Sequence, residues 1–501
     1  MEVYFIMARN FKKIAALLLA LITVVGSMAS CAGGDQGGTA ADTGSDVTTA
    51  VTEAVTEKEA YKAAIPEGTN YEGYEFKLHV FPEPGADPTW YDADFSATEE
   101  TGETLNDAAF IRMRNVNEML NIKIVPLNAK SDGSELQKAV QSNSDTYDAG
   151  FVDTFGCASI SQSGYLMNLH DVPTLDLSQP WWDQHAVEDL PIAGKLYMVT
   201  GDIGTMYKKS IGVILFNKQL AANDMTMPNP YELVANKQWT IDAFIEMSKK
   251  VSEDINGDGK YNKDDKYGLL YYCDMIALGL LGAGVEYTAK DSEGLPTIIF
   301  YSDKTVKVFE KYTELLFDKT LSFSWSASGL KNDDVIAMFQ DNRGLFNFNE
   351  FHAIENMRQM DTDFGILPMP LYDENQEDYR HSVNPHVAAM AVVPKSNLDM
   401  ERIGYVLDAL GAESKNILTP AYYETYLKGK GARDDESEAS LDIIFSTLRY
   451  DIGYLYNFGN LGQFTLDMVN TYKGDIASRY TKLEPSIMKA LQKAIDNYMK
   501  E

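Results

Sequence analysis

Beyond a long N-terminal stretch, the apolar residues of the chain fall into regular periods. Residues 75–81 alternate between polar and apolar positions as in a β-strand, and residues 122–127 and 147–153 form two further extended runs. Apolar side chains between 105 and 120 recur every three or four positions, which predicts a helix, and Ser134 begins a second, shorter one. Strand, helix, strand, helix, strand is typical of a parallel α/β sheet.

The third of these strands ends in polar residues. In parallel α/β sheets, ligands bind beyond the carboxyl ends of the strands. Asp153 and Thr154 are therefore candidate ligand-binding residues, although a solvated loop would account for them equally well.

The alternation continues toward the C-terminus. We expect strands at 195–199, 211–216, 344–348 and 364–367, and helices at 241–251, 305–317, 333–339, 399–410 and from Pro485 onward. No internal repeat is visible in this part of the chain.

The first thirty residues have a different pattern. Three basic residues between positions 9 and 13 precede an apolar run at 14–25, and small residues lead from there to Cys31. This pattern is typical of a secretory signal peptide at 1–30, and the apolar run is short for a membrane span. The small residues before Cys31 resemble the bacterial lipobox, although Met28 stands where leucine is usual. We expect Cys31 to carry a lipid anchor; an uncleaved membrane anchor is the alternative.

Residues 31–70 are rich in Gly, Ala, Thr, Asp and Glu, with no aromatic residue before Tyr61. Such a segment buries too little apolar surface to offset the entropy of ordering it. We expect a flexible tether that joins the lipid to a body beginning near residue 71.

Composition narrows the class of partner. The chain has 501 residues, with 43 Lys and Arg against 74 Asp and Glu, so its formal net charge is −31. Binding of nucleic acid or of anionic lipid through a basic face is therefore not expected. Three cysteines exclude a disulfide framework.

A loop at 254–265 has the spacing of a calcium-binding loop. Oxygen-bearing residues fall at its positions 1, 3, 5 and 9, and Gly259 stands at the sixth, where such a loop turns sharply. Asp265 stands at the last position, where glutamate is usual. We expect a structural calcium site, with an Asx- and Gly-rich turn without metal as the alternative. Its ligands would be Asp254, Asn256, Asp258, Lys260 through its carbonyl, Asn262 and Asp265.

No catalytic motif is present. The six histidines show no zinc-binding spacing, and no nucleophile elbow or phosphate-binding loop occurs. We therefore do not expect an enzyme. With 74 acidic residues, a glycosidase-like pair of carboxylates stays open as an alternative.

Aromatic residues cluster in or beside several expected loops. Trp181 and Trp182 are adjacent, and residues 346–351 read Phe-Asn-Phe-Asn-Glu-Phe. Aromatic faces pack on the C–H faces of sugar rings, while amide and carboxylate groups bind hydroxyls. Core packing is the alternative for each of them.

Taken together, several segments resemble those of bacterial extracellular solute-binding lipoproteins, the substrate-binding components of sugar-type ABC importers. The likeness covers about residues 71–500. It rests on residues 94–108, 180–182, 200–202, 216–218, 230–240, 256–259, 363–370 and 420–424.

This resemblance implies an α/β, two-lobed type II periplasmic-binding-protein fold with a ligand cleft between the lobes. The first lobe would comprise residues 71–205 and 360–412, and the second residues 206–359 and 413–501. The lobes would close over the ligand by a hinge motion.

The resemblance also implies the function: binding of a carbohydrate or oligosaccharide and its delivery to ABC-transporter permease subunits. The protein would be a monomer, held by its lipid at the outer face of the cytoplasmic membrane. The expected ligand-binding residues are Asp153, Thr154, Trp181, Trp182, Asp202, Phe346, Asn347, Phe348 and Glu350. A glycerol phosphate is a rival ligand, for which Arg343 is the one nearby cation. A secreted hydrolase and a surface glycan-holding protein without a transporter are alternatives.

Overall fold

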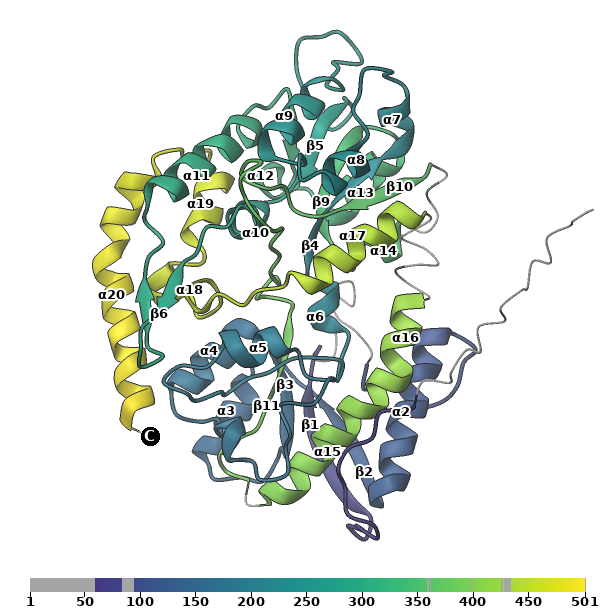
Figure 1. Ribbon diagram of the computed structural model, residues 1–501, viewed down its shortest axis with the longest axis vertical. Helices are drawn as coiled ribbons and strands as arrows, with labels where there is room; N and C mark the ends of the chain where they lie inside the picture. Colours follow the sequence, from purple (N-terminus) through teal and green to yellow (C-terminus); the bar gives the residue numbers. More distant parts are fainter. Residues whose placement is uncertain are drawn as a thin grey trace, which may run out of the picture. The chain divides into compact units, whose positions relative to one another are not determined.

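The computed structural model describes residues 59–82, 94–357, 360, 362–397, 399–424, 427 and 434–500 (Figure 1). The chain divides into two units after residue 58. The second unit, residues 59–501, holds all the helices and strands described below. The expected signal peptide, Cys31 and most of the tether lie outside the described residues. No helix within the described ranges is both long and apolar enough to cross a membrane.

The first sheet has the strand order β11-β3-β1-β2. Strand β1 pairs in parallel with both β2 and β3, and β11 runs antiparallel to β3. Helices α2, α3 and α4 follow β1, β2 and β3, which confirms the expected alternation. The bounds are β1 Tyr74–Val80, β2 Ile122–Asn128, β3 Ala149–Asp153, β11 Ala389–Val392, α2 Thr104–Leu120, α3 Ser134–Gln141 and α4 Thr154–Gln162.

The second sheet has the order β10-β4-β9-β5-β8. Strand β9 is parallel to β5 and antiparallel to β4, and β5 is parallel to β8. The bounds are β4 Gly212–Asn217, β5 Tyr267–Tyr271, β8 Ser322–Ser324, β9 Gly344–Glu350 and β10 Phe364–Leu367, and a separate hairpin joins β6 Thr288–Lys290 to β7 Pro296–Ile298.

The remaining helices cover these sheets and connect them. They are α5 Gln184–Asp189, α6 Met206–Lys209, α7 Lys218–Ala222, α8 Pro230–Ala235, α9 Ile241–Lys249, α10 Met275–Gly282, α11 Asp303–Leu316, α12 Trp325–Ser328, α13 Asn332–Gln340, α14 Ala353–Asn356, α15 Met400–Glu413, α16 Thr419–Tyr422, α17 Asp435–Ser446, α18 Ile452–Leu455, α19 Phe464–Asn470 and α20 Ile476–Lys500. Short helices η2 Leu169–Asp171 and η5 Phe458–Asn460 are of the 3₁₀ type, and η3 Ser414–Leu418 is a π-helix between α15 and α16.

The chain crosses between the two sheets three times. Strands β3 and β4 lie in different sheets, as do β10 and β11. The third crossing leads through α15, η3 and α16, which pack on the first sheet's α2, to α17, which packs on β10. An antiparallel bridge between Ile211 and Val383 joins the first crossing to the second.

Two expected boundaries are corrected. Strand β10, placed with the first lobe from the sequence, pairs with β4 in the second sheet, because its apolar residues match the register of that strand. Helix α20 begins nine residues before Pro485, at Ile476. Its buried residues continue across the proline, and this packing outweighs the loss of one backbone hydrogen bond.

The inner end of the expected tether is also ordered. Residues 59–70 are described, and their side chains alternate between half-buried and exposed positions from Tyr61 to Pro66. Tyr61, Ala63 and Ile65 pack against the hydrophobic core. Local composition did not predict this, because the ordering depends on contacts that three apolar side chains make with distant residues.

Candidate functional site

Polar side chains from both sheets meet at the second crossing. Asp153 is the last residue of β3, Glu350 is the last residue of β9, and Asp274 follows β5. Residues 384–386 of the second crossing bind Asp274 and Glu350 directly. They also contact Thr154 and Phe155, which follow Asp153. The carboxyl ends of strands in the two sheets thus converge on one short segment, as the rule for α/β sheets predicts.

Asn384 connects this group. Its side-chain amide donates to Asp274 Oδ2 at 2.8 Å and to Glu350 Oε1 at 2.9 Å. Its side-chain oxygen Oδ1 accepts the backbone N–H of His386 at 3.0 Å. Its backbone N–H donates to Ser210 O of the first crossing at 2.8 Å. One residue, through its side chain and its backbone, therefore joins two acids of the second sheet to two crossing segments.

His386 is the exposed member of the cluster. Its ring stands edge-on to Phe155, with centroids 4.6 Å apart, and its Nε2 lies 3.2 Å from Gln463 Nε2. A positive charge on its imidazole would lower the pKa of both Asp153 and Asp274. An exposed imidazole is therefore within electrostatic range of an acid of each sheet.

The acids of this cluster hold their protons more tightly than usual. Burial raises the pKa of Asp153 to about 6, against the hydrogen bond that its Oδ1 accepts from Gly156 N at 2.7 Å. Burial raises the pKa of Glu350 to about 8, and it also raises the pKa of Asp274. A carboxylic acid can donate as well as accept, so such groups suit hydroxyl ligands, which do both.

Aromatic side chains lie beside the acids of the second sheet. The ring of Tyr272 lies 5.2 Å from Trp325 and 5.3 Å from Phe348. Trp325 is partly exposed, and neither its indole N–H nor the hydroxyl of Tyr272 has a hydrogen-bond partner among the described residues. Trp325 thus offers a partly exposed apolar face, and two buried donors without partners in the described part of the chain lie beside it.

Sequence reasoning missed five of these residues as ligand candidates: Tyr272, Asp274, Trp325, Asn384 and His386. A signal for two of them was available. Tyr272 and Trp325 directly follow β5 and β8, so the rule that selected Asp153 would have selected them once these strands were recognised.

Thr154 supports the second crossing. Its N–H donates to Pro385 O and its hydroxyl to Ala388 O, both at 3.1 Å. The side chain is fully buried. Thr154 thus holds the backbone that carries His386.

Trp181 and Trp182 are not at a surface open to ligand. Their side chains are 1% and 2% exposed, and both indole N–H groups donate to Asp408 Oδ1, at 3.0 and 2.9 Å. Trp181 also packs directly against Gly411 of α15. The expectation that one of them faces the cleft is corrected, because the pair anchors α15 to the first sheet's body.

Phe346 and Phe348 have different surroundings, although both are fully buried. Phe346 lies in the core against Trp239, which precedes α9, and against Phe244 within α9. Their ring centroids are 5.6 and 4.9 Å from that of Phe346. Phe348 lies behind Tyr272, which is closer to the site. Neither ring is the open aromatic platform expected of both, and in this group of rings Trp325 is the one that is partly exposed.

Asn347 points to the other face of β9 from these rings. It is fully buried, and neither its amide nitrogen nor its oxygen has a hydrogen-bond partner among the described residues. Its backbone pairs with Leu215 and Leu270 on either side.

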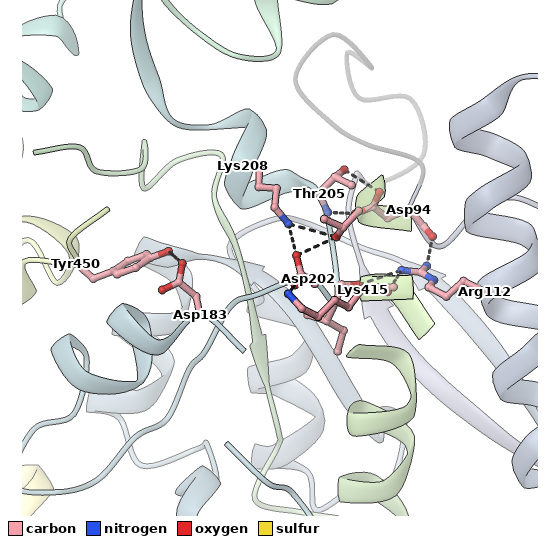
Figure 2. A network of polar contacts seen from close by, with 11 residues as sticks. Asp94, Arg112, Asp183, Asp202, Thr205, Lys208, Lys415 and Tyr450 are labelled. Atoms are coloured by element: carbon pink, nitrogen blue, oxygen red, sulfur yellow. Dashed lines mark hydrogen bonds and ion pairs between the residues drawn. The ribbon is translucent and has the colours of Figure 1, made fainter. Parts of the chain in front are cut away.

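Asp202 belongs to an ion network between crossings (Figure 2). Its two carboxylate oxygens accept from Lys208 Nζ and Lys415 Nζ, each at 2.7 Å, and from Thr419 Oγ1 at 2.9 Å. Burial opposes its ionisation, but the two ammonium groups lower the pKa of Asp202 overall. Asp202 was expected among the ligand-binding residues, but its oxygens are occupied, which favours a role in supporting the crossings.

Arg343 lies at the opposite end of β9 from Glu350. It forms ion pairs with Asp341 and Asp264, at 2.6 and 3.7 Å. Seven residues of strand span about 20 Å. This arginine therefore does not supply a cation to the cluster around Asn384.

The two described cysteines are not activated nucleophiles. Cys157 is fully buried, and burial raises the pKa of both thiols, that of Cys273 to about 12. A nucleophilic thiolate needs a lowered pKa. Covalent catalysis through these groups is not supported.

The loop at 254–265 adopts the sharp turns expected of it. Gly257 and Gly259 have φ of 70° and 75°, and both donate their N–H to the carboxylate of Asp254. Asp265 is buried and accepts N–H bonds from Ile255 and Asn262. No group of three or more His, Cys, Asp or Glu side chains in the described part of the chain is arranged to hold a metal ion, so calcium binding stays a prediction.

Comparison with known proteins gives a fold but no sequence family. No protein-family model matches the chain, and no curated protein matches its sequence. Among solved structures it is similar to a cyclic α-maltosyl-1,6-maltose binding protein from Arthrobacter globiformis, with a TM-score of 0.55 and 14% identity over 84% of this chain and 99% of that one.

Two further structures are similar to the same extent. An ABC substrate-binding protein from Listeria monocytogenes in complex with cycloalternan has a TM-score of 0.52 and 14% identity over 85% of this chain and 98% of that one. UgpB from Mycobacterium tuberculosis in complex with glycerophosphocholine has a TM-score of 0.53 and 14% identity over 85% of this chain and 99% of that one. These likenesses show the type II periplasmic-binding-protein fold that was expected.

Proposed function

We propose that this protein binds a carbohydrate, with an oligosaccharide as the leading candidate, and delivers it to an ABC importer. The observation that carries the proposal is the cluster around Asn384. Acids from both sheets, an exposed histidine and the Tyr272–Trp325 pair meet where the strands of both sheets end. Two of the similar solved structures carry carbohydrate-binding descriptions, which supports the same class of ligand.

The chemistry of the cluster favours a neutral polyol over an anion. The acids offer donors and acceptors to hydroxyl groups, and aromatic faces pack on the C–H faces of sugar rings. A phosphate ester needs clustered cations, and His386 is the one basic side chain among the residues that form this cluster. Because UgpB was solved with glycerophosphocholine, the experiment below includes this phosphate ester as a rival ligand.

A thermal-shift screen tests the ligand class. Linear and cyclic maltodextrins, other oligosaccharides and glycerophosphocholine are added in turn to the full chain. We expect a sugar to raise the melting temperature, and we expect Trp325→Ala to abolish the rise. Tyr301→Ala is the matched control, since Tyr301 is a 45%-exposed aromatic that stacks on Tyr480 in α20. Stabilisation by glycerophosphocholine and by no sugar would overturn the proposal.

A hydrolase is the second candidate, because Asp274 and Glu350 share one amide group of Asn384. A retaining glycosidase, however, needs one of its two acids ionised as the nucleophile, and burial raises the pKa of both. We expect no products when the protein is incubated with a glycan mixture. Release of products that is lost in Glu350→Gln would favour the enzyme.

We further propose export and anchoring through a lipid on Cys31. Cys31→Ser is expected to move the protein from the membrane fraction to the soluble fraction, and mass spectrometry of the wild-type N-terminus would detect the acyl chains. Stimulation of a reconstituted permease by the sugar-loaded protein would separate a transport component from a glycan-holding protein.

A further inference from the structure

Residues 59–65, at the start of the described chain, contact the third crossing. Tyr61, Ala63 and Ile65 turn toward the body, and the residues between them are exposed. We call residues 59–65 the strap. It precedes β1 by nine residues, and in the other direction the chain leads back to Cys31.

The strap is fixed at Tyr61 by a reciprocal pair of hydrogen bonds. Its N–H donates to Asn416 Oδ1 at 2.9 Å, and its carbonyl oxygen accepts from Asn416 Nδ2 at 2.8 Å. The ring of Tyr61 lies 5.3 Å from the ammonium group of Lys415. Two consecutive residues of the crossing thus contact one residue of the strap.

Those two residues belong to the π-helix η3. Such a turn is wider than an α-helical one and changes the direction in which successive side chains point. Ser414 accepts from Arg112 of α2 at 3.3 Å, Lys415 pairs with Asp202 of the first crossing, and Asn416 binds the strap. Three consecutive side chains therefore reach three separate parts of the chain.

The ion network extends this contact to the first crossing. Figure 2 shows Asp202 between Lys208 and Lys415, with Asp94 and Arg112 on the side of α2. The side chains of Asp202 and Lys208 are 10% and 9% exposed, so the interaction is little screened by solvent. Lys208 belongs to the first crossing and Lys415 to the third. A rotation of one sheet against the other that separates these crossings would move the two ammonium groups apart and strain their shared contact with Asp202.

The geometry points to the strap as part of the hinge: by holding the π-helical turn, residues 59–65 bias the equilibrium between the open and closed arrangements of the two sheets. The inference rests on the proposed function in assuming that these sheets move about their crossings. It adds that the chain leading to the expected lipid anchor is connected to the moving part. Tension or release at the N-terminal side would then change the population of the ligand-binding arrangement.

Hydrogen–deuterium exchange of the full chain without ligand tests this coupling. Asn416→Ala removes the reciprocal bonds, and Tyr61→Ala removes the ring contact with Lys415. Asn416→Ala is expected to speed exchange at residues 414–418 by roughly tenfold, the effect of losing two ordinary hydrogen bonds, and Tyr61→Ala by less. Exchange should also rise at residues 202–211, which Lys415 joins to the π-helix through Asp202. Lys62→Ala, an exposed neighbour on the strap, should change neither region.

Faster exchange confined to residues 59–66 and 414–418 would overturn the inference, since it would show a local contact without effect on the hinge. If Asn416→Ala unfolds the crossing helix, Tyr61→Pro serves instead, because it removes the strap's N–H and leaves Asn416 in place. No sugar enters the measurement, so failure of the carbohydrate proposal would leave this result interpretable.

Discussion

Asp408 holds both adjacent tryptophans of the first sheet's body. Its Oδ1 accepts the two indole N–H groups and its Oδ2 accepts the N–H of Asp176 at 2.9 Å. Burial raises the pKa of Asp408 in spite of these bonds. The side chain is thus a buried acceptor shared by three donors.

Replacing Asp408 is expected to destabilise the fold strongly. Asp408→Ala leaves three donors without their acceptor and should lower the free energy of unfolding by about 3 kcal/mol or more. Asp408→Asn keeps one oxygen for the indoles and should cost less. Urea denaturation measures the change, with the exposed Glu401→Ala on the same helix as control. A midpoint unchanged by Asp408→Ala would contradict the assignment of the indole bonds.

Glu350 makes stability depend on pH in a defined direction. Its pKa is raised from 4.5 to about 8, so between these values the folded chain holds a proton that the unfolded chain has released. Stability therefore falls as pH rises through this window, by up to about 1.4 kcal/mol per pH unit. His352 lies 3.7 Å away, but burial lowers its pKa to about 3, so it supplies no compensating charge.

Glu350→Gln removes this titration. The difference in free energy of unfolding between wild type and variant should change steadily from pH 5 to pH 8, in favour of the variant at high pH. Buried acids that do not contact Asn384 contribute equally to both proteins and cancel. Parallel profiles would show that Glu350 is ionised in the fold at neutral pH.

At the scale of elements, helix α20 joins the two halves of the molecule. Near its start, Tyr480 stacks on Tyr301 beside the second sheet, with centroids 5.0 Å apart. Near its end, the hydroxyl of Tyr498 donates to Ser161 of α4 at 2.9 Å, and its carbonyl oxygen accepts from Lys195. The sequence-based assignment of this segment to the second lobe alone therefore misses its contact with the first.

Tyr498→Ala is expected to release the end of this helix. The side chain is 2% exposed, and truncation of a buried aromatic costs about 3–5 kcal/mol. Thermal unfolding measures the loss, and exchange at residues 157–162 should rise. Met499→Ala changes the next residue, which is 60% exposed, and should have no effect. Equal behaviour of the two variants would argue against the anchoring role.

Thermal unfolding with added calcium tests the metal site predicted for the loop at 254–265. At a calcium concentration ten times its Kd, binding should add about 1.4 kcal/mol to stability and raise the melting temperature. Asp258→Ala should remove the response, whereas Asp264→Asn, at a loop position that supplies no ligand, should keep it. An unchanged melting temperature at several millimolar calcium would leave the loop as a turn without metal.

At the scale of the whole molecule, the three crossings set what a ligand can do. Two sheets joined by short segments can rotate about them, and a ligand that contacts both sheets favours the closed arrangement. A saturating sugar should therefore lower the radius of gyration in solution scattering and protect residues 384–388 from exchange. At one hundred times Kd it should also add about 2.7 kcal/mol to stability. A sugar that raises the melting temperature without compaction would indicate binding to one sheet only.

Local patterns in the sequence determined the strands and helices, because period and capping depend on neighbouring residues. They also determined where polar residues follow strands, and so they selected Asp153. Glu350 was expected instead from the aromatic segment at 346–351 and from the resemblance, and the structure brings both residues to one cluster. The export signature and the tether expected of residues 1–58 rest on the sequence alone.

Only the tertiary structure decided which aromatic rings are open and which polar groups meet. Trp181 was expected at the ligand cleft, but its indole N–H donates to Asp408, which is 227 residues away in the sequence. Asn384 and His386 carry no local signal, since their role comes from strands that end beside them. Burial and partnership depend on residues distant in the chain, and spacing along one strand or helix does not contain that information.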